Sequence, residues 1–399
     1  MKIVDFETFV VGNPPPHYGG FNWVFLKLIT DEGIEGIGEA YCVPFRPNAV
    51  VHLIEDVGER YVVGSDPFKI ERLWRIVYYS SYAQHPDLTV MGVLSAFEMA
   101  CWDIVGKELG QPIYNLLGGQ FHEKLRSYTY LYPEPEDRAH GDITHRIATH
   151  IEPERAAARA VEYVKQGFTA VKFDPIRDLM SPFTPTELSL EKLDNAEAVV
   201  RNVREAGGNK CDLLIGTHGE MTTSSAIRLA KRIEKYDPLW FEEPVPPENK
   251  DEMARVARST SIPIATGERL STKYEFRELL EKQAAVILQM ALGRVGGILE
   301  AKKITGMAEA YYAQIAPHLY CGPIEGAANI QLATCSPNFL IQESIEKWEG
   351  FHTEILKKPI RWEDGYIIPP TEPGLGIELN EEVAVKHPYN EIEPGTHHW

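Results

Sequence analysis

The chain of 399 residues has 58 acidic and 40 basic side chains, which gives a formal net charge of −18 at pH 7. This charge repels phosphate, so we expect no nucleic-acid partner. The composition, 44% hydrophobic and 25% charged, is typical of a globular protein. No uninterrupted apolar run approaches the roughly 20 residues of a membrane span. The first residues contain no apolar signal-peptide core, so we expect a cytoplasmic protein with no membrane partner.

The length of the chain and the spacing of its cysteines restrict the domain organisation and the kinds of site that we expect. A chain of 399 residues is too long for one small core and suits a barrel-sized domain with a smaller one. The five cysteines are scattered and form no Cys-x-x-Cys pair. This spacing indicates neither a zinc site nor a disulfide framework, and we expect buried, reduced thiols.

The N-terminal third begins with a predicted hairpin and continues with a long helix. Residues 24–30 and 36–40 have the pattern of strands on either side of an Asp-Glu-Gly turn. Residues 12–20 contain three consecutive prolines, which exclude a helix or a central strand there. We expect this segment to be an exposed loop that could cover a site. Apolar residues at helical spacing predict a helix over residues 94–104.

From about residue 125, short apolar runs alternate with helical patterns. Strand–helix units repeated in this way predict a (β/α)8-type barrel. A doubly wound sheet is the alternative, but no Gly-x-Gly-x-x-Gly sequence follows an early strand. One of the predicted helices covers residues 225–236. The predicted strands cover residues 127–131, 170–174, 213–217, 239–242, 264–267, 286–289, 314–316 and 339–342.

Polar or ionisable residues follow almost every predicted barrel strand. Catalytic groups of a barrel lie at the C-terminal ends of its strands. Carboxylates that converge there repel one another unless a cation neutralises them, and oxygen ligands favour Mg²⁺. We therefore interpret Glu242 and Glu268 as ligands of Mg²⁺ rather than as exposed surface acids.

Two other strand ends point to proton transfer. His318 follows an Ala-Pro sequence at a strand end, and an ordinary imidazole pKa of about 6.5 suits a general acid or base at neutral pH. The alternative is a surface histidine or a hydrogen-bonded core histidine. Lys172 ends an earlier strand, where it could stabilise a substrate carboxylate or act as a base. The alternative for Lys172 is an outward-facing lysine.

Several motifs in both halves of the chain resemble those of one known family. They are Ala-Cys-Trp-Asp-Ile-Val-Gly-Lys at 100–107, Gly-Gln-Pro at 110–112, Leu-Leu-Gly-Gly at 116–119, Phe-Glu-Glu-Pro at 241–244, Gly-Glu-Arg-Leu at 267–270 and Gly-Gly-Ile at 296–298. Together they resemble the enolase superfamily, and within it the mandelate racemase branch with its sugar-acid dehydratases. The resemblance covers essentially the whole chain. It implies a modified (β/α)7β barrel over residues 125–350 and an α+β capping domain formed by residues 1–124 and the returning segment 351–399.

The resemblance also implies a chemistry. Mg²⁺ binds the substrate carboxylate and stabilises the enediolate that forms when the α-proton is removed. By position, Glu242 and Glu268 match the second and third metal ligands. Glu343 matches the carboxylate that hydrogen-bonds the enediolate.

The same comparison of positions assigns the acid–base groups. His318 matches the histidine base of the seventh strand. His218 matches the acid that protonates the leaving 3-hydroxyl in dehydratases of the galactonate and gluconate type. Lys172 matches the first lysine of the second-strand motif.

The sequence departs from the family pattern at the first metal ligand. Gly216 stands where a carboxylate is expected. The first ligand is then His218, Glu220 or water. If His218 binds the metal, it cannot also serve as the free acid.

Two more departures concern the bases. Ala291 stands where an aspartate usually pairs with the histidine base, so His318 needs another partner to fix its tautomer. Asp174 stands where racemases carry a second lysine. Racemisation needs a base on each face of the substrate, so this residue favours elimination from one face. We place Asp174 in the substrate pocket.

We therefore predict a hydro-lyase that converts a sugar acid to a 2-keto-3-deoxy acid. The alternatives are an isomerase or cycloisomerase that uses the same enediolate, and a non-catalytic barrel that binds a metabolite. Family members are often dimers or octamers, so the resemblance implies a homo-oligomer. Loop residues that could contact a polyol substrate are His17, Tyr18, Trp23 and Arg46.

Overall fold

The computed structural model describes residues 1–41, 46–80, 85, 87–134, 143–177 and 184–389, with the side chains of 143–146 left out. The N-terminal domain pairs an antiparallel sheet with helices. The strands follow the order β1-β2-β3, which confirms the predicted hairpin. The strands are β1 (Ile3–Gly12), β2 (Asn22–Thr30) and β3 (Glu35–Ala40), and the helices are α1 (Pro47–Val57), the π-helix Gly58–Val62, α2 (Ile70–Tyr78), α3 (Leu88–Glu108) and α4 (Ile113–Leu116).

Helix α3 is the core of this domain. Asp87 caps its first turn by accepting hydrogen bonds from the backbone N–H groups of Thr89 and Val90. Most of its residues from Met91 to Gly106 are buried on all sides. The helix is long and apolar enough to cross a membrane, but 78% of its apolar window is buried inside the protein. A long apolar helix that is buried in this way is the core helix of a globular domain.

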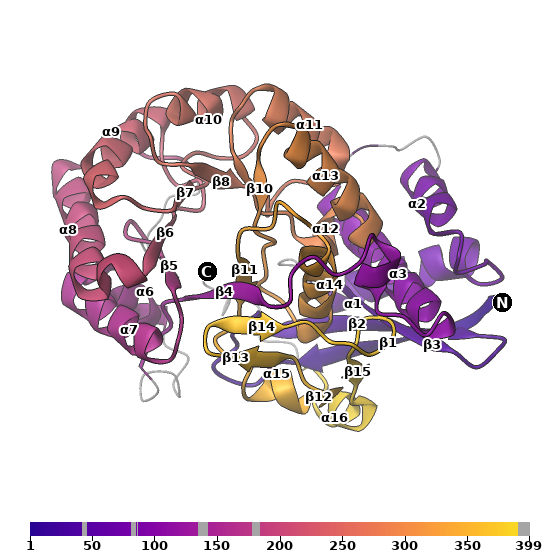
Figure 1. Cartoon of the computed structure of the whole chain (residues 1–399). Helices are drawn as coiled ribbons and strands as arrows, with labels where there is room; N and C mark the ends of the chain where they lie inside the picture. The colour runs from indigo at the N-terminus through magenta and orange to yellow at the C-terminus, as the bar shows by residue number, and fades with distance from the viewer. Residues whose placement is uncertain (42–45, 81–84, 86, 135–142, 178–183, 390–399) are drawn as a thin grey trace.

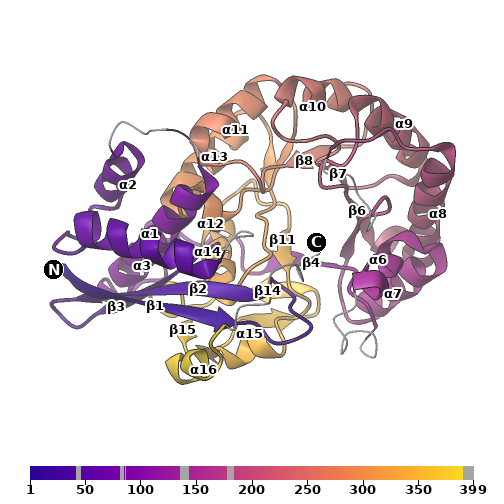
Figure 2. The same cartoon turned by 180° about the vertical axis from the view of Figure 1, so that it is seen from behind.

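The second part of the chain is a barrel of parallel strands ringed by helices (Figures 1 and 2). Neighbouring strands pair in parallel from β4 to β10, and β11 pairs with β4. Its strands are β4 (Leu125–Tyr130), β5 (Ala170–Phe173), β6 (Asp212–Gly216), β7 (Trp240–Glu242), β8 (Ile264–Thr266), β9 (Ile287–Leu288), β10 (Gln314–Ile315) and β11 (Gln342–Ser344). Its helices are α6 (Ile143–Ile151), α7 (Pro153–Lys165), α8 (Leu190–Gly207), α9 (Thr223–Ile233), α10 (Lys250–Ala257), α11 (Thr272–Glu281), α12 (Leu292–Val295), α13 (Ile298–Ala310) and α14 (Pro323–Thr334), with 3₁₀ turns at Gly208–Lys210 and Glu234–Tyr236.

The predicted barrel strands agree with the structure except at the last. The apolar run at 339–342 predicted a strand, but the regular pairing with β4 begins only at Gln342. Phe339 instead forms a single parallel bridge to Ile315 of β10. The apolar run therefore closes the barrel on the β10 side, and the three polar residues after it continue on the β4 side.

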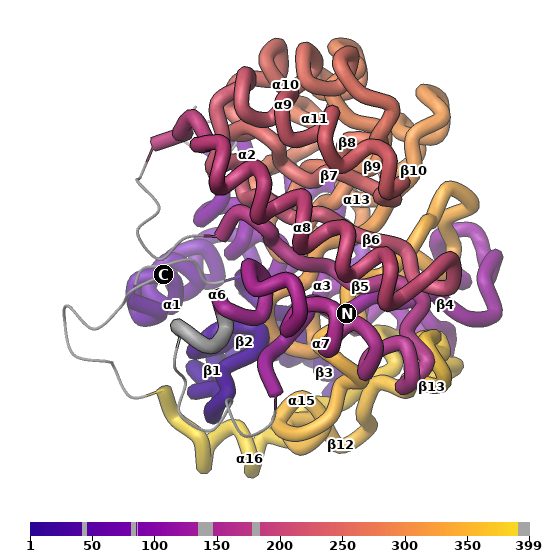
Figure 3. The backbone as a smooth tube through the Cα atoms, turned by 90° about the vertical axis from the view of Figure 1, so that its left-hand side faces the viewer, coloured from indigo at the N-terminus to yellow at the C-terminus, as the bar shows by residue number. Residues whose placement is uncertain are grey.

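The C-terminal segment lies against both parts of the chain (Figure 3). Strand β14 pairs antiparallel with β4 of the barrel, and the backbone after α16 bonds β1 through Gly12 N–H to His387 O at 2.8 Å. The division of the chain at residues 124 and 350 stays a prediction. The elements of this segment are α15 (Phe351–Glu354), β12 (Leu356–Lys358), β13 (Arg361–Glu363), β14 (Tyr366–Ile368), β15 (Glu378–Leu379) and α16 (Glu381–Lys386).

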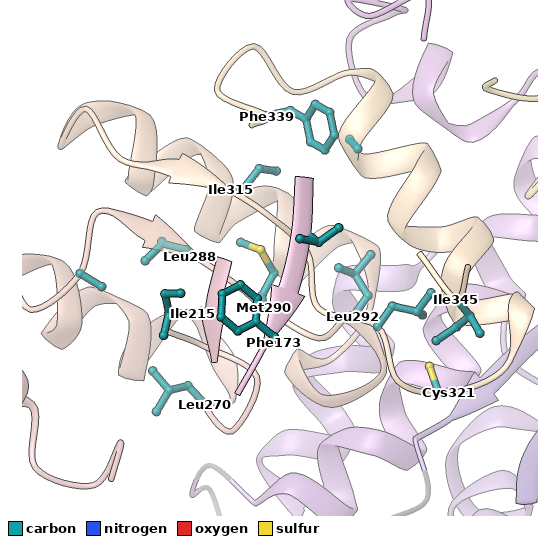
Figure 4. Close-up of a cluster of buried hydrophobic side chains, with 14 of the residues drawn as sticks. Phe173, Ile215, Leu270, Leu288, Met290, Leu292, Ile315, Cys321, Phe339 and Ile345 are labelled. Carbon is teal, nitrogen blue, oxygen red and sulfur yellow. The ribbon is translucent and has the colours of Figure 1, made fainter. Parts of the chain in front are cut away.

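Side chains of each barrel strand alternate between two hydrophobic clusters, as a period of two requires. One cluster fills the barrel interior and includes Leu214, Trp240 and Ile287. The other packs strands against helices and contains the intervening residues, among them Ile215 and Leu288 (Figure 4). The alternation decides which residue at each strand end points toward the barrel axis.

Two buried glutamates of the N-terminal domain cap barrel helices. Glu98 of α3 accepts hydrogen bonds from the N–H groups of Ile298 (2.7 Å) and Leu299 (2.8 Å), the first residues of α13. Glu39 of β3 accepts from the N–H of Gly322 (2.6 Å), at the start of α14. A carboxylate is favoured at a helix N-terminus by the unpaired N–H groups and the helix dipole. These contacts join the two parts of the chain through buried carboxyl caps, and burial raises the pKa of Glu98 and of Glu39 to about 8.

The proline-containing segment at 12–20 is a loop, as predicted, but it is less exposed than expected, and its role as a cover over a site stays a prediction. Asn13 is buried, and its side-chain amide donates to the carbonyls of Tyr18 (2.9 Å) and Gly20 (2.7 Å). Trp23 is 1% exposed and its indole N–H donates to Gly19 O at 2.9 Å. The segment is folded onto itself and packed because these internal hydrogen bonds satisfy its backbone.

His352 holds this segment from the C-terminal side and makes stability depend on pH. Its ring lies 4.9 Å from that of Trp23, and burial lowers the pKa of His352 from 6.5 to about 4. The unfolded chain takes up this proton first as the pH falls, so the stabilisation is complete above about pH 6.5 and is lost toward pH 4. We expect the free energy of unfolding to drop by about 2 kcal/mol from pH 7 to pH 5 through this group.

Urea denaturation of wild type and His352→Gln at both pH values measures this effect. The variant should lose that component of the pH dependence, whereas His52→Gln, at an exposed histidine, should keep it. An equal pH dependence in wild type and His352→Gln would contradict the prediction.

Candidate active site

The alternation of the strands brings polar side chains to one level of the barrel. Each of the following residues lies two positions after an interior apolar residue, and so points to the same side of its strand. They form a layer above the hydrophobic interior, at the C-terminal ends of the strands, where barrel enzymes carry their chemistry. The residues are Lys172, Gly216, Glu242, Gln289, His318 and Glu343.

Lys172 and Glu242 form the centre of this layer. Lys172 Nζ lies 2.6 Å from Glu242 Oε1 and 3.5 Å from Glu343 Oε1. The amide of Gln289 donates to Glu242 Oε2 at 2.7 Å, so both oxygens of this carboxylate are bound. Burial alone would lower the pKa of Lys172, but the charges of Glu242 and Glu343 hold it well above its ordinary value. Lys172 is therefore an inward-facing ammonium, not an outward-facing surface lysine.

His318 is held between the barrel and the N-terminal domain. Its Nδ1 lies 2.9 Å from Glu343 Oε2 and 3.3 Å from Glu268 Oε2, although the N–H direction is not aligned for a hydrogen bond. Its Nε2 lies 3.4 Å from the hydroxyl of Tyr41, whose ring stacks on the imidazole. The two glutamates are the acidic groups that contact His318 in this structure, where Ala291 supplies none.

The two carboxylates near His318 also set its proton affinity. Burial alone would lower the pKa of His318, but Glu268 and Glu343 outweigh burial and raise it. Conversely, burial would raise the pKa of Glu343, but Lys172 and His318 lower it to about 2. An imidazole that gains a proton here is stabilised by both carboxylates.

His218 lies on the turn after β6, and Asp174 follows β5. His218 Nδ1 is 2.8 Å from Asp174 Oδ2, and the His218 side chain is 32% exposed. Burial would raise the pKa of Glu268, but His318 and His218, followed by Lys172, hold it well below its ordinary value. Both imidazoles therefore act electrostatically on the Glu268 carboxylate, whose Oε2 lies 3.3 Å from His318 Nδ1.

The donor set at the strand ends offers a divalent metal two carboxylates. Among the residues that the structure describes, no three His, Cys, Asp or Glu side chains are grouped to hold a metal ion. A Cβ atom at Gly216 would lie 3.3 Å from Lys172 Cε, so the lysine stem passes the position from which the expected third carboxylate would project. Glu242 and Glu268 remain as oxygen donors. Two carboxylates with water and a substrate group are a common Mg²⁺ environment.

Charge balance favours a cation with an anionic substrate. With His318 neutral, as its predicted role of base requires, Lys172 offsets one of the three carboxylates Glu242, Glu268 and Glu343. Two net negative charges remain, and a substrate carboxylate adds a third. A divalent ion that arrives with the substrate offsets two of these charges, whereas the substrate alone would increase the repulsion.

Other predicted site residues lie elsewhere. The Glu220 carboxylate lies 3.4 Å from Arg177 Nη1, and His218 Nδ1 lies 2.8 Å from Asp174 Oδ2. Within the described part of the chain, neither residue belongs to a group of three metal-binding side chains. Asp174 is fully buried against His218, so its contact is with a histidine rather than with a substrate.

The loop residues predicted to contact a polyol are mostly occupied by packing. Trp23 belongs to the hydrophobic core, and Tyr18 is 7% exposed with its ring stacked 3.8 Å from that of Tyr132. His17 Nδ1 lies 2.6 Å from Asn13 O. Arg46 is exposed immediately before helix α1. The described contacts therefore bring none of these four residues to the layer around Lys172.

Two contributors were missed from the sequence. Gln289 ends a predicted strand, and the period of two places it on the same side as the interior residue Ile287. An amide side chain, however, does not by itself indicate a catalytic or metal-binding role. Tyr41 reaches His318 from the N-terminal domain, and nothing in the local sequence indicates that contact. Its ring is also covered by the Arg294 guanidinium at 3.7 Å.

A barrel capped by an α+β domain, with carboxylates, a lysine and histidines at the strand ends, is the architecture of a barrel enzyme. Residues 155–383 match the model of the enolase C-terminal domain-like family, and residues 19–118 match that of the mandelate racemase/muconate lactonizing enzyme N-terminal domain. The chain belongs to the mandelate racemase/muconate lactonizing enzyme family of the enolase superfamily.

Known proteins are similar to this chain over almost its whole length. A D-galactonate dehydratase from Pectobacterium atrosepticum is 32% identical over 98% of this chain and 95% of its own length. A D-gluconate/D-galactonate dehydratase from Picrophilus torridus is 34% identical over 93% of this chain and 89% of its own. A solved structure from Labrenzia alexandrii DFL-11, provisionally assigned to this family, is 57% identical with a TM-score of 0.93 and covers 98% of both chains. The chain is thus an enzyme of the family's hydro-lyase type.

Proposed function

We propose that this protein removes water from a sugar acid to give a 2-keto-3-deoxy sugar acid. The observation that carries the proposal is the set of groups around Glu268, whose carboxylate lies 3.3 Å from His318 and whose pKa is lowered by both His318 and His218, with the Lys172 ammonium 2.6 Å from Glu242. Elimination needs a base for the C2 proton and an acid for the 3-hydroxyl, and these two imidazoles are the available pair. The dehydratase relatives support the same reaction class and a sugar-acid substrate.

His318 takes the C2 proton. Glu268 and Glu343 lie on its Nδ1 side and favour a proton there, which leaves Nε2 to accept the proton from the substrate. The imidazolium that forms is stabilised by the same carboxylates. Lys172 offsets the negative charge that develops on the substrate carboxylate.

His218, as the imidazolium, then gives its Nε2 proton to the C3 hydroxyl, which leaves as water, and the ring is left neutral with its proton on Nδ1. The C2–H and C3–O bonds break, a C2–C3 double bond forms, and the resulting enol tautomerises to the 2-keto acid. The site is largely closed to water, since Lys172, Glu242, Glu343 and His318 are each at most 6% exposed. Buried charges act more strongly on the reacting atoms because little solvent screens them.

Mg²⁺ is the proposed cofactor, and Glu242 and Glu268 are the residues that would hold it. When bound it supplies Lewis-acid stabilisation of the charge on the substrate carboxylate oxygens. Dehydratases of this superfamily are generally metal-dependent. We also propose a cytoplasmic homo-oligomer, a dimer or an octamer, whose partner is a small carboxylate rather than a nucleic acid or a membrane.

A substrate screen tests the proposal. Purified protein with Mg²⁺ would be incubated with aldonic, uronic and aldaric acids, beginning with D-galactonate and D-gluconate, and 2-keto acid would be measured. We expect a product one water lighter than its substrate. A product of unchanged mass would favour the isomerase alternative. Absence of both product and bound metal would favour the metabolite-binding barrel.

Metal binding gives a prediction independent of turnover. Mn²⁺ titration followed by electron paramagnetic resonance should show a site that Glu268→Gln weakens by at least about tenfold, because a charged ligand is lost. Lys172→Met should tighten the site, since its ammonium no longer competes for Glu242. Glu309→Gln, on the outer helix α13, is the control. Mn²⁺ binding that is indifferent to both site variants would place the metal elsewhere.

A further inference from the structure

The contact between Asp174 and His218 has the geometry of a catalytic dyad. Asp174 Oδ2 lies 2.8 Å from His218 Nδ1, and the aspartate is fully buried. Its other oxygen accepts a hydrogen bond from Ile176 N–H at 3.3 Å. Arg177 Nη1 lies 4.0 Å from Oδ2 and supplies further positive charge. The carboxylate is therefore fixed by its own loop and is aimed at one nitrogen of the imidazole.

The backbone that carries His218 is fixed independently. The Thr217 hydroxyl lies 2.8 Å from the carbonyl oxygens of both Glu242 and Glu243, and Gly219 N–H donates to Glu243 O at 2.7 Å. Arg269 donates to His218 O at 2.9 Å. His218 has φ of 48°, a left-handed conformation that these bonds hold in place. Rotation of the side chain is then the remaining freedom, and Asp174 removes it.

An ionised carboxylate can only accept hydrogen bonds, so Nδ1 must carry the proton in this contact. Burial would raise the pKa of Asp174, but His218 and Arg177 lower it, so the carboxylate stays ionised. Within the described residues, Nε2 of His218 has no hydrogen-bond partner. The free nitrogen is therefore the one that can face a substrate hydroxyl.

We infer that Asp174 is the positioning residue that holds the Nδ1–H of His218, so that the imidazolium gives its Nε2 proton to the leaving hydroxyl and is left as the neutral Nδ1–H tautomer. The catalytic half of this inference rests on the proposed dehydration, whereas the tautomer does not. Asp174 would orient the acid, His218. In the family pattern, an aspartate at the position of Ala291 orients the base, His318.

Asp174→Asn tests the inference with little change of shape. The amide can donate to Nδ1, which favours the opposite tautomer, with the proton on Nε2. Nitrogen-15 solid-state NMR of histidine-labelled protein, with the His218 signal assigned through His218→Asn, reports which nitrogen is protonated in the neutral ring. We expect Nδ1–H in wild type and a shift to Nε2–H in Asp174→Asn.

Kinetics supply the second measurement once a substrate is known. We expect kcat of Asp174→Asn to fall by about 10²-fold with KM changed by less than about threefold, as for loss of an interaction used in the transition state. Asp212→Asn, at the opposite end of β6 and paired with Arg126, is the matched control and should leave both values unchanged.

The two measurements separate failure of the inference from failure of the proposed function. An unchanged His218 tautomer in Asp174→Asn, or a wild-type ring with its proton on Nε2, would overturn the inference whether or not a substrate is found. An altered tautomer in a protein without dehydratase activity would support the positioning role and reject the reaction. Thermal unfolding of the variant near the wild-type temperature shows that the readouts come from folded protein.

Discussion

His318→Asn should abolish dehydration, with a loss of kcat of at least about 10³-fold. Asparagine keeps a polar side chain of similar reach but has no nitrogen that can accept the C2 proton. The loss also removes the cation that Glu268 and Glu343 stabilise when the imidazole is protonated. Steady-state assays of 2-keto acid formation measure the effect on any substrate that the wild-type enzyme converts.

The control for this variant must separate chemistry from packing. Tyr41→Phe removes the hydroxyl that lies 3.4 Å from His318 Nε2 but retains the ring that stacks on the imidazole. It should lower kcat far less than His318→Asn, because the base itself remains. If His318→Asn retained more than about one tenth of the wild-type kcat, His318 could not be the base.

Glu98→Ala should lower the free energy of unfolding by at least about 3 kcal/mol, because it leaves buried donors without acceptors. Three groups lose their partner at once: the N–H groups of Ile298 and Leu299, and the indole N–H of Trp102, which donates at 2.8 Å. Alanine has a higher helix propensity than glutamate, so a change in the helix propensity of α3 does not add to the loss of stability.

Urea denaturation measures this loss, with Glu108→Ala as the matched control on the same helix. Glu108 is exposed at the end of α3, and its replacement should change stability by less than about 0.5 kcal/mol. Equal effects of the two substitutions would show that the cap on α13 does not hold the N-terminal domain to the barrel.

Most of the barrel could be predicted from the sequence because strand periodicity is a local property. A period of two places Lys172 on the same side of its strand as Ala170, and Gly216 on the same side as Leu214. The last strand was shifted because Phe339 is apolar yet bridges only β10. Apolar composition alone cannot distinguish a bridging residue from the start of a regular ladder.

Contacts between distant segments could not be predicted in the same way. Glu98 lies in a helix that is buried on nearly all sides, and only its place opposite the start of α13 explains a carboxylate there. The Lys172 side chain passes the position that a Cβ atom of Gly216 would face, and this contact likewise depends on the pairing of β5 with β6. We predicted that Asp174 contacts the substrate because the sequence does not show its true partner. That partner, His218, lies 44 residues away, and a turn with an unusual backbone conformation fixes its position.

The central claim is that one histidine removes the C2 proton and the other releases the hydroxyl. Incubation of the substrate in D₂O, followed by mass spectrometry and proton NMR, separates the two steps. We expect His218→Asn to exchange deuterium into C2 without forming product, and His318→Asn to do neither. Exchange that persists in His318→Asn and disappears in His218→Asn would contradict the account, because it would assign the base to the other imidazole.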